Sequence, residues 1–100
     1  MSAAGLATVT IPIPRQQRWR LQRYTVLTNQ ASTVTTMPIA TLYSGSVADG
    51  NSIDTTYTGA RDSGSCDLWF EGGDRIVCQW TGGVAGTIAT LSILGEVDNI

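Results

Sequence analysis

The chain has 100 residues, of which 42% are apolar and 14% charged, with no histidine, two cysteines and a formal net charge of −2. This length makes one domain, and the charged content lies well below the roughly 25% of ordinary soluble proteins. Without histidine the chain lacks the commonest catalytic base and metal ligand, and the acidic balance argues against nucleic-acid binding, which needs a sustained basic surface.

The charge is unevenly distributed along the chain. Residues 1–48 contain four arginines and no acid, whereas residues 49–100 contain all eight acids and two arginines. The two halves either neutralise each other within the fold, or form a dipolar surface that pairs with neighbouring copies or a partner. The N-terminus lacks the features of a secretory signal, and no stretch approaches the ~20 apolar residues of a membrane span. We expect a chain that is made and used as it stands, beginning in the cytoplasm, with no membrane partner.

Short segments rich in Thr, Val and Ile alternate with clusters of Gly, Ser, Asn and Asp, which is typical of all-β sandwiches and barrels. We expect a single antiparallel, jelly-roll-like β-sandwich of seven to eight strands. It would span residues 15–95, after an N-terminal arm and edge strand over residues 1–14 and before a tail over residues 96–100. The expected strands cover residues 6–13, 18–28, 37–44, 52–58, 65–70, 75–81 and 87–95.

Prolines and arginines mark the first two strands. Pro12 and Pro14 cannot donate a ladder hydrogen bond, so the first strand should lie at an edge or leave the sheet there. In "RQQRWRLQRY", Arg18 and Arg20 share one face of the second strand, joined by Gln22 if the strand is regular. These arginines either form a solvated face or grip the carboxylates of a neighbouring chain.

The segment "DGNSID" brings Asp49, Asn51 and Asp54 close together in the sequence. Oxygen ligands at this spacing can hold calcium, but the complete calcium-loop motif is missing and Asp-Gly-Asn is also ordinary turn chemistry. Together with the missing histidine, this predicts no metal and no cofactor. A catalytic pair of carboxylates would need a cleft that so small a chain could hardly form, so we do not expect an enzyme.

The segment "FEGGDRIVCQW" alternates apolar and polar residues on both sides of two glycines. If the flanking strands pair directly, parity excludes a two-residue loop and favours a loop of three or five residues. A three-residue loop would place Cys66 opposite Cys78. Alternatively, the two strands belong to different sheets and the glycines form a corner. The cysteines could form a disulfide, but without a signal peptide we expect two reduced thiols.

Trp69 lies on the face of its strand opposite Leu68 and Phe70. An exposed tryptophan can stack on a sugar or fill a pocket of a partner. It could equally lie under a loop of its own chain, with Arg75 over its ring as a cation–π pair.

The run "DLWFEGGDRIVCQWTGGVAGTIATLSILG", with "RWRLQRYTV", "ATLYSG" and "SIDTTYTGARDS" before it, resembles small β-sandwich structural proteins of tailed bacteriophages, especially those of actinobacterial hosts. The resemblance covers most of residues 10–95 and involves framework residues of a sandwich. Such proteins decorate capsids, build head fibres or sit in tails. The resemblance therefore implies a role in virion assembly, with trimers where the role is decoration.

The expectation that follows is a capsid decoration protein on the virion surface, which binds the major capsid protein and stabilises the head. Its contacts would come from Arg18, Arg20, Trp69 and the arm that carries Pro12 and Pro14. The alternative is a tail or fibre-tip module that recognises a host glycan through Trp69 and the loop of residues 49–54.

Overall fold

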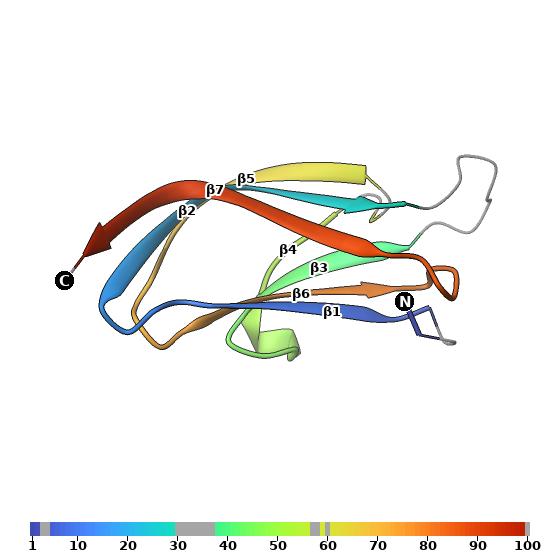
Figure 1. Cartoon of the computed structure of the whole chain (residues 1–100), viewed down its shortest axis with the longest axis horizontal. Coiled ribbons are helices and arrows are strands. Elements are labelled where there is room, and N and C mark those ends of the chain that lie inside the picture. Colours follow the sequence, from blue (N-terminus) through green and yellow to red (C-terminus); the bar gives the residue numbers. More distant parts are fainter. Residues whose placement is uncertain (3–4, 30–37, 57–58, 60, 100) are drawn as a thin grey trace.

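A computed structural model describes residues 1–2, 5–29, 38–56, 59 and 61–99. These residues form a sandwich of two antiparallel sheets, which confirms the expected fold class. The four-stranded sheet has the order β1-β6-β3-β4 and the three-stranded sheet the order β5-β2-β7 (Figure 1). The strands are β1 (Ala7–Pro12), β2 (Gln17–Thr28), β3 (Ile39–Ser44), β4 (Ser52–Thr55), β5 (Arg61–Phe70), β6 (Arg75–Thr81) and β7 (Ala89–Asn99), with a short 3-10 turn, η1 (Asp49–Asn51), before β4.

The core lies between the sheets, and alternation along β6 supplies its centre. Ile76, Cys78 and Trp80 are each at most 1% exposed. The buried indole N–H of Trp80 donates to the carbonyl oxygen of Gly59 at 2.9 Å, so burial of this side chain leaves no polar atom unpaired. Leu21, Tyr24, Val26, Leu42 and Phe70 complete much of the core from the other strands.

The expected strand limits hold best where alternation is strongest. The strand over residues 75–81 matches β6, and that over residues 18–28 differs from β2 by one residue. The last strand continues to Asn99, so residues 96–99 of the expected tail are part of β7. The expected strands also included residues 37 and 57–58, which lie outside the described residues.

The two glycines of "FEGGDRIVCQW" form a corner and no hairpin. Strands β5 and β6 belong to different sheets, so the directly paired arrangement, with Cys66 opposite Cys78, is wrong. The amide of Asp74 donates to the carbonyl oxygen of Glu71, and Gly73 has a φ of 93° between them. A positive φ at the third position of a turn favours glycine. The turn thus carries the chain from one sheet to the other.

The N-terminal segment is an edge strand of its own sandwich. Among the described residues, strand β1 pairs with β6 alone, at the outside of the four-stranded sheet, as its prolines predict. Before it, the terminal amino group of Met1 donates to the carbonyl oxygen of Thr87, and the amide of Gly83 donates to Gly5. The described part of the arm therefore packs on its own chain.

Candidate interaction site

A β-bulge at Gln22 determines which side chains of β2 face the core. The partner register shifts between Leu21 and Arg23 on both sides of this strand. Before the bulge, Leu21 is buried and Arg18 and Arg20 face outward; after it, Tyr24 and Val26 are buried. The expected pairing of the two arginines on one face holds, but the strand is irregular at Gln22.

Trp69 on β5 and the arginines of β2 form a stacked cluster on the outer face of the three-stranded sheet. Arg20 and Trp69 are direct cross-strand partners. The guanidinium carbon of Arg18 lies 4.4 Å from the centre of the indole ring and that of Arg20 lies 5.9 Å from it. Both distances are within the range of cation–π attraction. We call Arg18, Arg20 and Trp69 the Arg–Trp cluster.

Acidic side chains of the same sheet and of the corner after β5 surround the Arg–Trp cluster. Asp67 accepts from Nε and Nη2 of Arg20 at 2.7 and 3.1 Å, and Glu96 lies 3.8 Å from Nη1. These hydrogen bonds hold the pKa of Asp67 below its usual value and raise the pKa of Arg20. Glu71 lies 3.2 Å from Nε of Arg18, although that contact lacks hydrogen-bond alignment. A partner's carboxylate would therefore compete with Asp67 for the fork of Arg20.

Trp69 remains 41% exposed in spite of these neighbours. The sequence suggested Arg75 as a cation–π partner of Trp69, but Arg75 begins β6 in the other sheet. The arginines of β2 stack on the indole ring instead. Pro12 ends β1 opposite Arg75, and Pro14 accepts a hydrogen bond from the amide of Gln17 at the corner into β2. Both prolines are exposed, but they belong to the corner and are not part of the Arg–Trp cluster.

A polar cleft of about 360 Å³ adjoins Trp69. It lies between the edge strand β5 and the η1–β4 segment of the other sheet, and its lining includes Trp69, Leu68, Ser44, Asn51 and Ser52. The amide group of Asn51 donates to both oxygens of Ser46 and holds the loop in place. The structure thus brings Trp69 together with part of the loop that the glycan alternative requires.

Asp54 is not part of that cleft. Its carboxylate accepts a hydrogen bond from the hydroxyl of Tyr24, which joins β4 of one sheet to β2 of the other. Burial is the main cause of a raised pKa of Tyr24, and the Asp54 carboxylate raises it further. Within the described residues, no group of three or more His, Cys, Asp or Glu side chains could hold a metal ion. There is also no helix among them that is long and apolar enough to cross a membrane.

The two cysteines are free thiols. Cys78 is 1% exposed in the middle of β6, and burial raises its pKa to about 12. The half-buried Cys66 lies 3.6 Å from the carbonyl oxygen of Leu21, and burial likewise raises the pKa of this thiol. Raised pKa values suppress the reactive thiolate, so both side chains act as small apolar groups.

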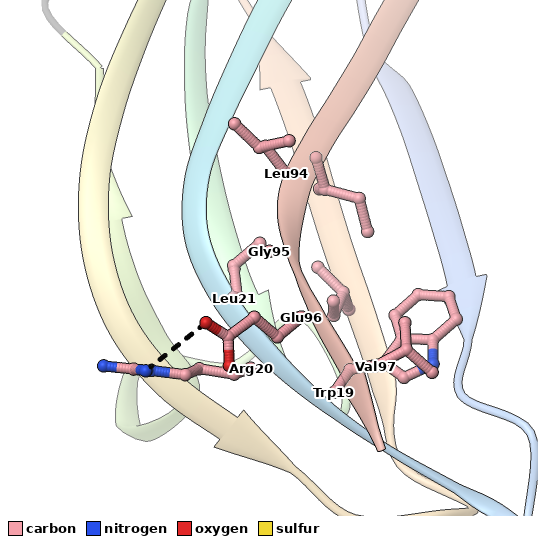
Figure 2. Close-up of a pocket in the computed structure, with 9 residues that line it drawn as sticks. Trp19, Arg20, Leu21, Leu94, Gly95, Glu96 and Val97 are labelled. Carbon is pink, nitrogen blue, oxygen red and sulfur yellow. Dashed lines mark ion pairs between the residues drawn. The ribbon is translucent and has the colours of Figure 1, made fainter. Parts of the chain in front are cut away.

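An apolar pocket of about 250 Å³ lies between β2, β6 and β7, and the sequence did not predict it. Trp19, Leu21, Ile93 and Val97 contribute to its lining, with Gly95 between them (Figure 2). Figure 2 shows Trp19 and Val97 on one side of the curved part of β7, while the ion pair of Arg20 and Glu96 points to the other. The only sequence signal for this pocket is the glycine inside the last strand.

Comparison of the chain with protein-family models, with curated proteins and with solved structures finds no match.

Proposed function

We propose that this chain is a virion structural protein of a tailed bacteriophage, of the decoration type, which binds the major capsid protein and stabilises the head. The observation that carries the interaction part of this proposal is the exposed Arg–Trp cluster on an open sheet face. Tryptophan and arginine are the residues most enriched at the energetic centres of protein interfaces. The sequence resemblance supplies the class of partner.

The geometry of the cluster supports a protein partner. Trp69 and Arg18 are held in a defined arrangement before binding, so less side-chain entropy is lost when a partner covers them. The surrounding carboxylates of Asp67, Glu71 and Glu96 give the patch both signs of charge. A mixed patch suits a partner whose surface carries both signs as well. Weak single contacts suffice on a shell, because many copies bind one repeating lattice.

The test begins with the copy number of the chain per purified virion of the phage that encodes it, measured by quantitative mass spectrometry. A ratio to the major capsid protein near one, or a fixed large fraction of it, is expected. In the same assay Trp69→Ala should lower the occupancy. Leu27→Ala is the matched control, because Leu27 lies on the outward side of the same sheet and is 43% exposed, against 41% for Trp69. Absence of the chain from the virion would remove the proposal.

One observation favours a second candidate, a module that binds a host glycan. The polar cleft places Trp69 beside Ser44, Asn51 and Ser52, and an aromatic ring next to hydroxyl and amide groups suits a sugar. Neither arginine of the cluster lines this cleft. A glycan array separates the two candidates, because only this one predicts sugar binding that Trp69→Ala abolishes. Few copies per virion together with a positive array would favour it.

A further inference from the structure

We propose that the apolar pocket between β2, β6 and β7 is a binding site for a small neutral aromatic molecule of about two fused rings. Its lining side chains Trp19, Leu21 and Ile93 pack on the core side of the three-stranded sheet, whereas the Arg–Trp cluster lies on the outer face of that sheet. The inference rests on the depth, polarity and size of the pocket, and does not depend on the proposed function.

The pocket extends from the surface of the molecule to its core. Val97, which lines it near the end of β7, is 53% exposed. Leu21 and Ile76 also line it, and both belong to the buried core. A guest that enters beside Val97 therefore leaves water and gains contacts with core side chains. Transfer of apolar surface out of water is the main source of affinity for an apolar ligand.

The polar side-chain groups around the pocket already have partners. The indole N–H of Trp19 donates to Oε1 of Gln17 at 2.9 Å. Arg20 and Glu96 border the pocket, but Figure 2 shows their charged groups paired with each other on the other side of β7. A charged or strongly polar ligand would lose its hydration here without gaining a hydrogen-bond partner. The pocket therefore favours a neutral, apolar guest.

The indole ring of Trp19 favours an aromatic guest over an aliphatic one. The ring contributes to the lining of the pocket beside Val97 (Figure 2). Its hydrogen bond to Gln17 orients it before any ligand binds, so little side-chain freedom is lost on binding. Two aromatic rings attract each other in offset-stacked or edge-to-face arrangements, in addition to the gain from apolar burial. A straight apolar chain gains only the burial.

The size of the pocket fits two fused rings. Its volume is about 250 Å³. An engineered apolar cavity of about 150 Å³ in another protein binds benzene, so the larger volume here admits a second ring. Water beside apolar walls is poorly ordered, and its displacement by an apolar group gains affinity. Indole is neutral, has two fused rings and dissolves well enough to be titrated, so it is the probe for the test.

The test titrates the methyl-labelled chain with indole and follows the methyl signals by NMR. The signals of Leu21, Ile93 and Val97 should shift saturably, because these side chains line the pocket. The signal of Leu68 should not shift, because Leu68 is next to the exposed Trp69 and would report stacking of indole there. Uracil, a polar ring, should not bind. The straight-chain alcohol 1-octanol should bind more weakly than indole, because it cannot stack on Trp19.

Two matched variants test the place of binding. Val97→Trp should fill the pocket and weaken indole binding by about tenfold or more. Val47→Trp should bind indole like the wild type, because Val47 is also exposed, at 43%, but does not line the pocket. Both substitutions are at exposed positions, so both variants should fold.

Several outcomes would overturn the proposal. They are the absence of saturable shifts at Leu21, Ile93 and Val97, shifts at Leu68 alone, and binding of uracil at the pocket. Binding of 1-octanol as tight as that of indole would also overturn it, in favour of an aliphatic chain as the guest. Wild-type affinity for indole in Val97→Trp, or equal losses in Val97→Trp and Val47→Trp, would show that indole binds elsewhere.

Discussion

The guanidinium group of Arg18 lies over the indole ring of Trp69, with 4.4 Å between the guanidinium carbon and the ring centre. The two residues come from different strands, 51 positions apart in the sequence, and meet on the outer face of one sheet. An exposed cation–π pair contributes about 0.5–1 kcal/mol to the free energy of unfolding. The contact thus orients the indole of the Arg–Trp cluster more than it stabilises the fold.

A double-mutant cycle with Arg18→Met and Trp69→Leu should give a coupling free energy of about 0.5–1 kcal/mol in urea unfolding. Methionine keeps an apolar stem of similar length and removes the charge. Arg75→Met combined with Trp69→Leu is the control, because Arg75 lies on β6 in the other sheet. Its coupling should be zero within error. A coupling of the same size for Arg75 would contradict the stacking of Trp69 on the β2 arginines.

A second prediction concerns the hydrogen bond between the sheets. Tyr24→Phe removes the hydroxyl that donates to the carboxylate of Asp54 and keeps the buried ring. We expect a loss of about 1.5–3 kcal/mol in the free energy of unfolding, because hydrogen bonds to charged groups contribute more to stability than neutral ones. Tyr43→Phe is the matched control. The hydroxyl of Tyr43 has no hydrogen bond among the described residues, so this variant should change stability by less than about 0.5 kcal/mol.

A third prediction concerns alkaline pH. The thiol of Cys78 has a pKa of about 12 in the folded chain, against a usual value of 9.0. A folded-state pKa above the unfolded one gives stability that is complete below pH 9 and is lost as the pH rises toward 12. Between pH 8 and pH 10 the wild type should therefore lose roughly 1–1.5 kcal/mol more than Cys78→Val, which has no proton to release.

The measurement is urea unfolding at both pH values under reducing conditions. Tyr24 begins to ionise near pH 10 in the unfolded chain and Cys66 also titrates, but both are present in the wild type and the variant. The difference between the two proteins thus isolates Cys78. Equal losses in the wild type and Cys78→Val would show that this thiol is not held neutral by burial.

Local alternation was sufficient to predict the strands and the fold class. The pattern of Ile76, Cys78 and Trp80 predicts one buried face, and these three side chains form the centre of the core. Strand β5 begins at Arg61, whereas the sequence predicted a start at residue 65. The prediction missed the first residues of the strand because "RDSGS" has the composition of a turn, although this segment pairs with β2. Composition describes local preference, whereas this segment is held by a partner strand distant in the sequence.

Pairing between strands was not predictable, and the candidate site depends on it. The contacts of Trp69 with Arg18 and of Arg20 with Asp67 require the register of β2 and β5, which no local pattern contains. The sequence left the corner at Gly72 and Gly73 as one of two possibilities, because the alternation of apolar and polar residues fits a hairpin equally well. The bulge at Gln22 shifts the alternation by one residue within a single strand, and no sequence feature marks it in advance.

The last prediction tests whether the bulge requires glycine at residue 95. Gly95→Ala would push a Cβ against the carbonyl oxygen of Arg20, which belongs to the backbone and cannot rotate away. We expect a loss of about 1–3 kcal/mol in the free energy of unfolding, as for other overpacked sites. Gly50→Ala is the control. A Cβ at Gly50 would meet no atom within 4 Å and its φ is not positive, so this variant should gain about 0.4–1 kcal/mol from the less flexible unfolded chain. Opposite signs for the two variants would support the requirement for glycine beside the bulge, whereas a neutral Gly95→Ala would mean that β2 and β7 can separate enough to admit a side chain.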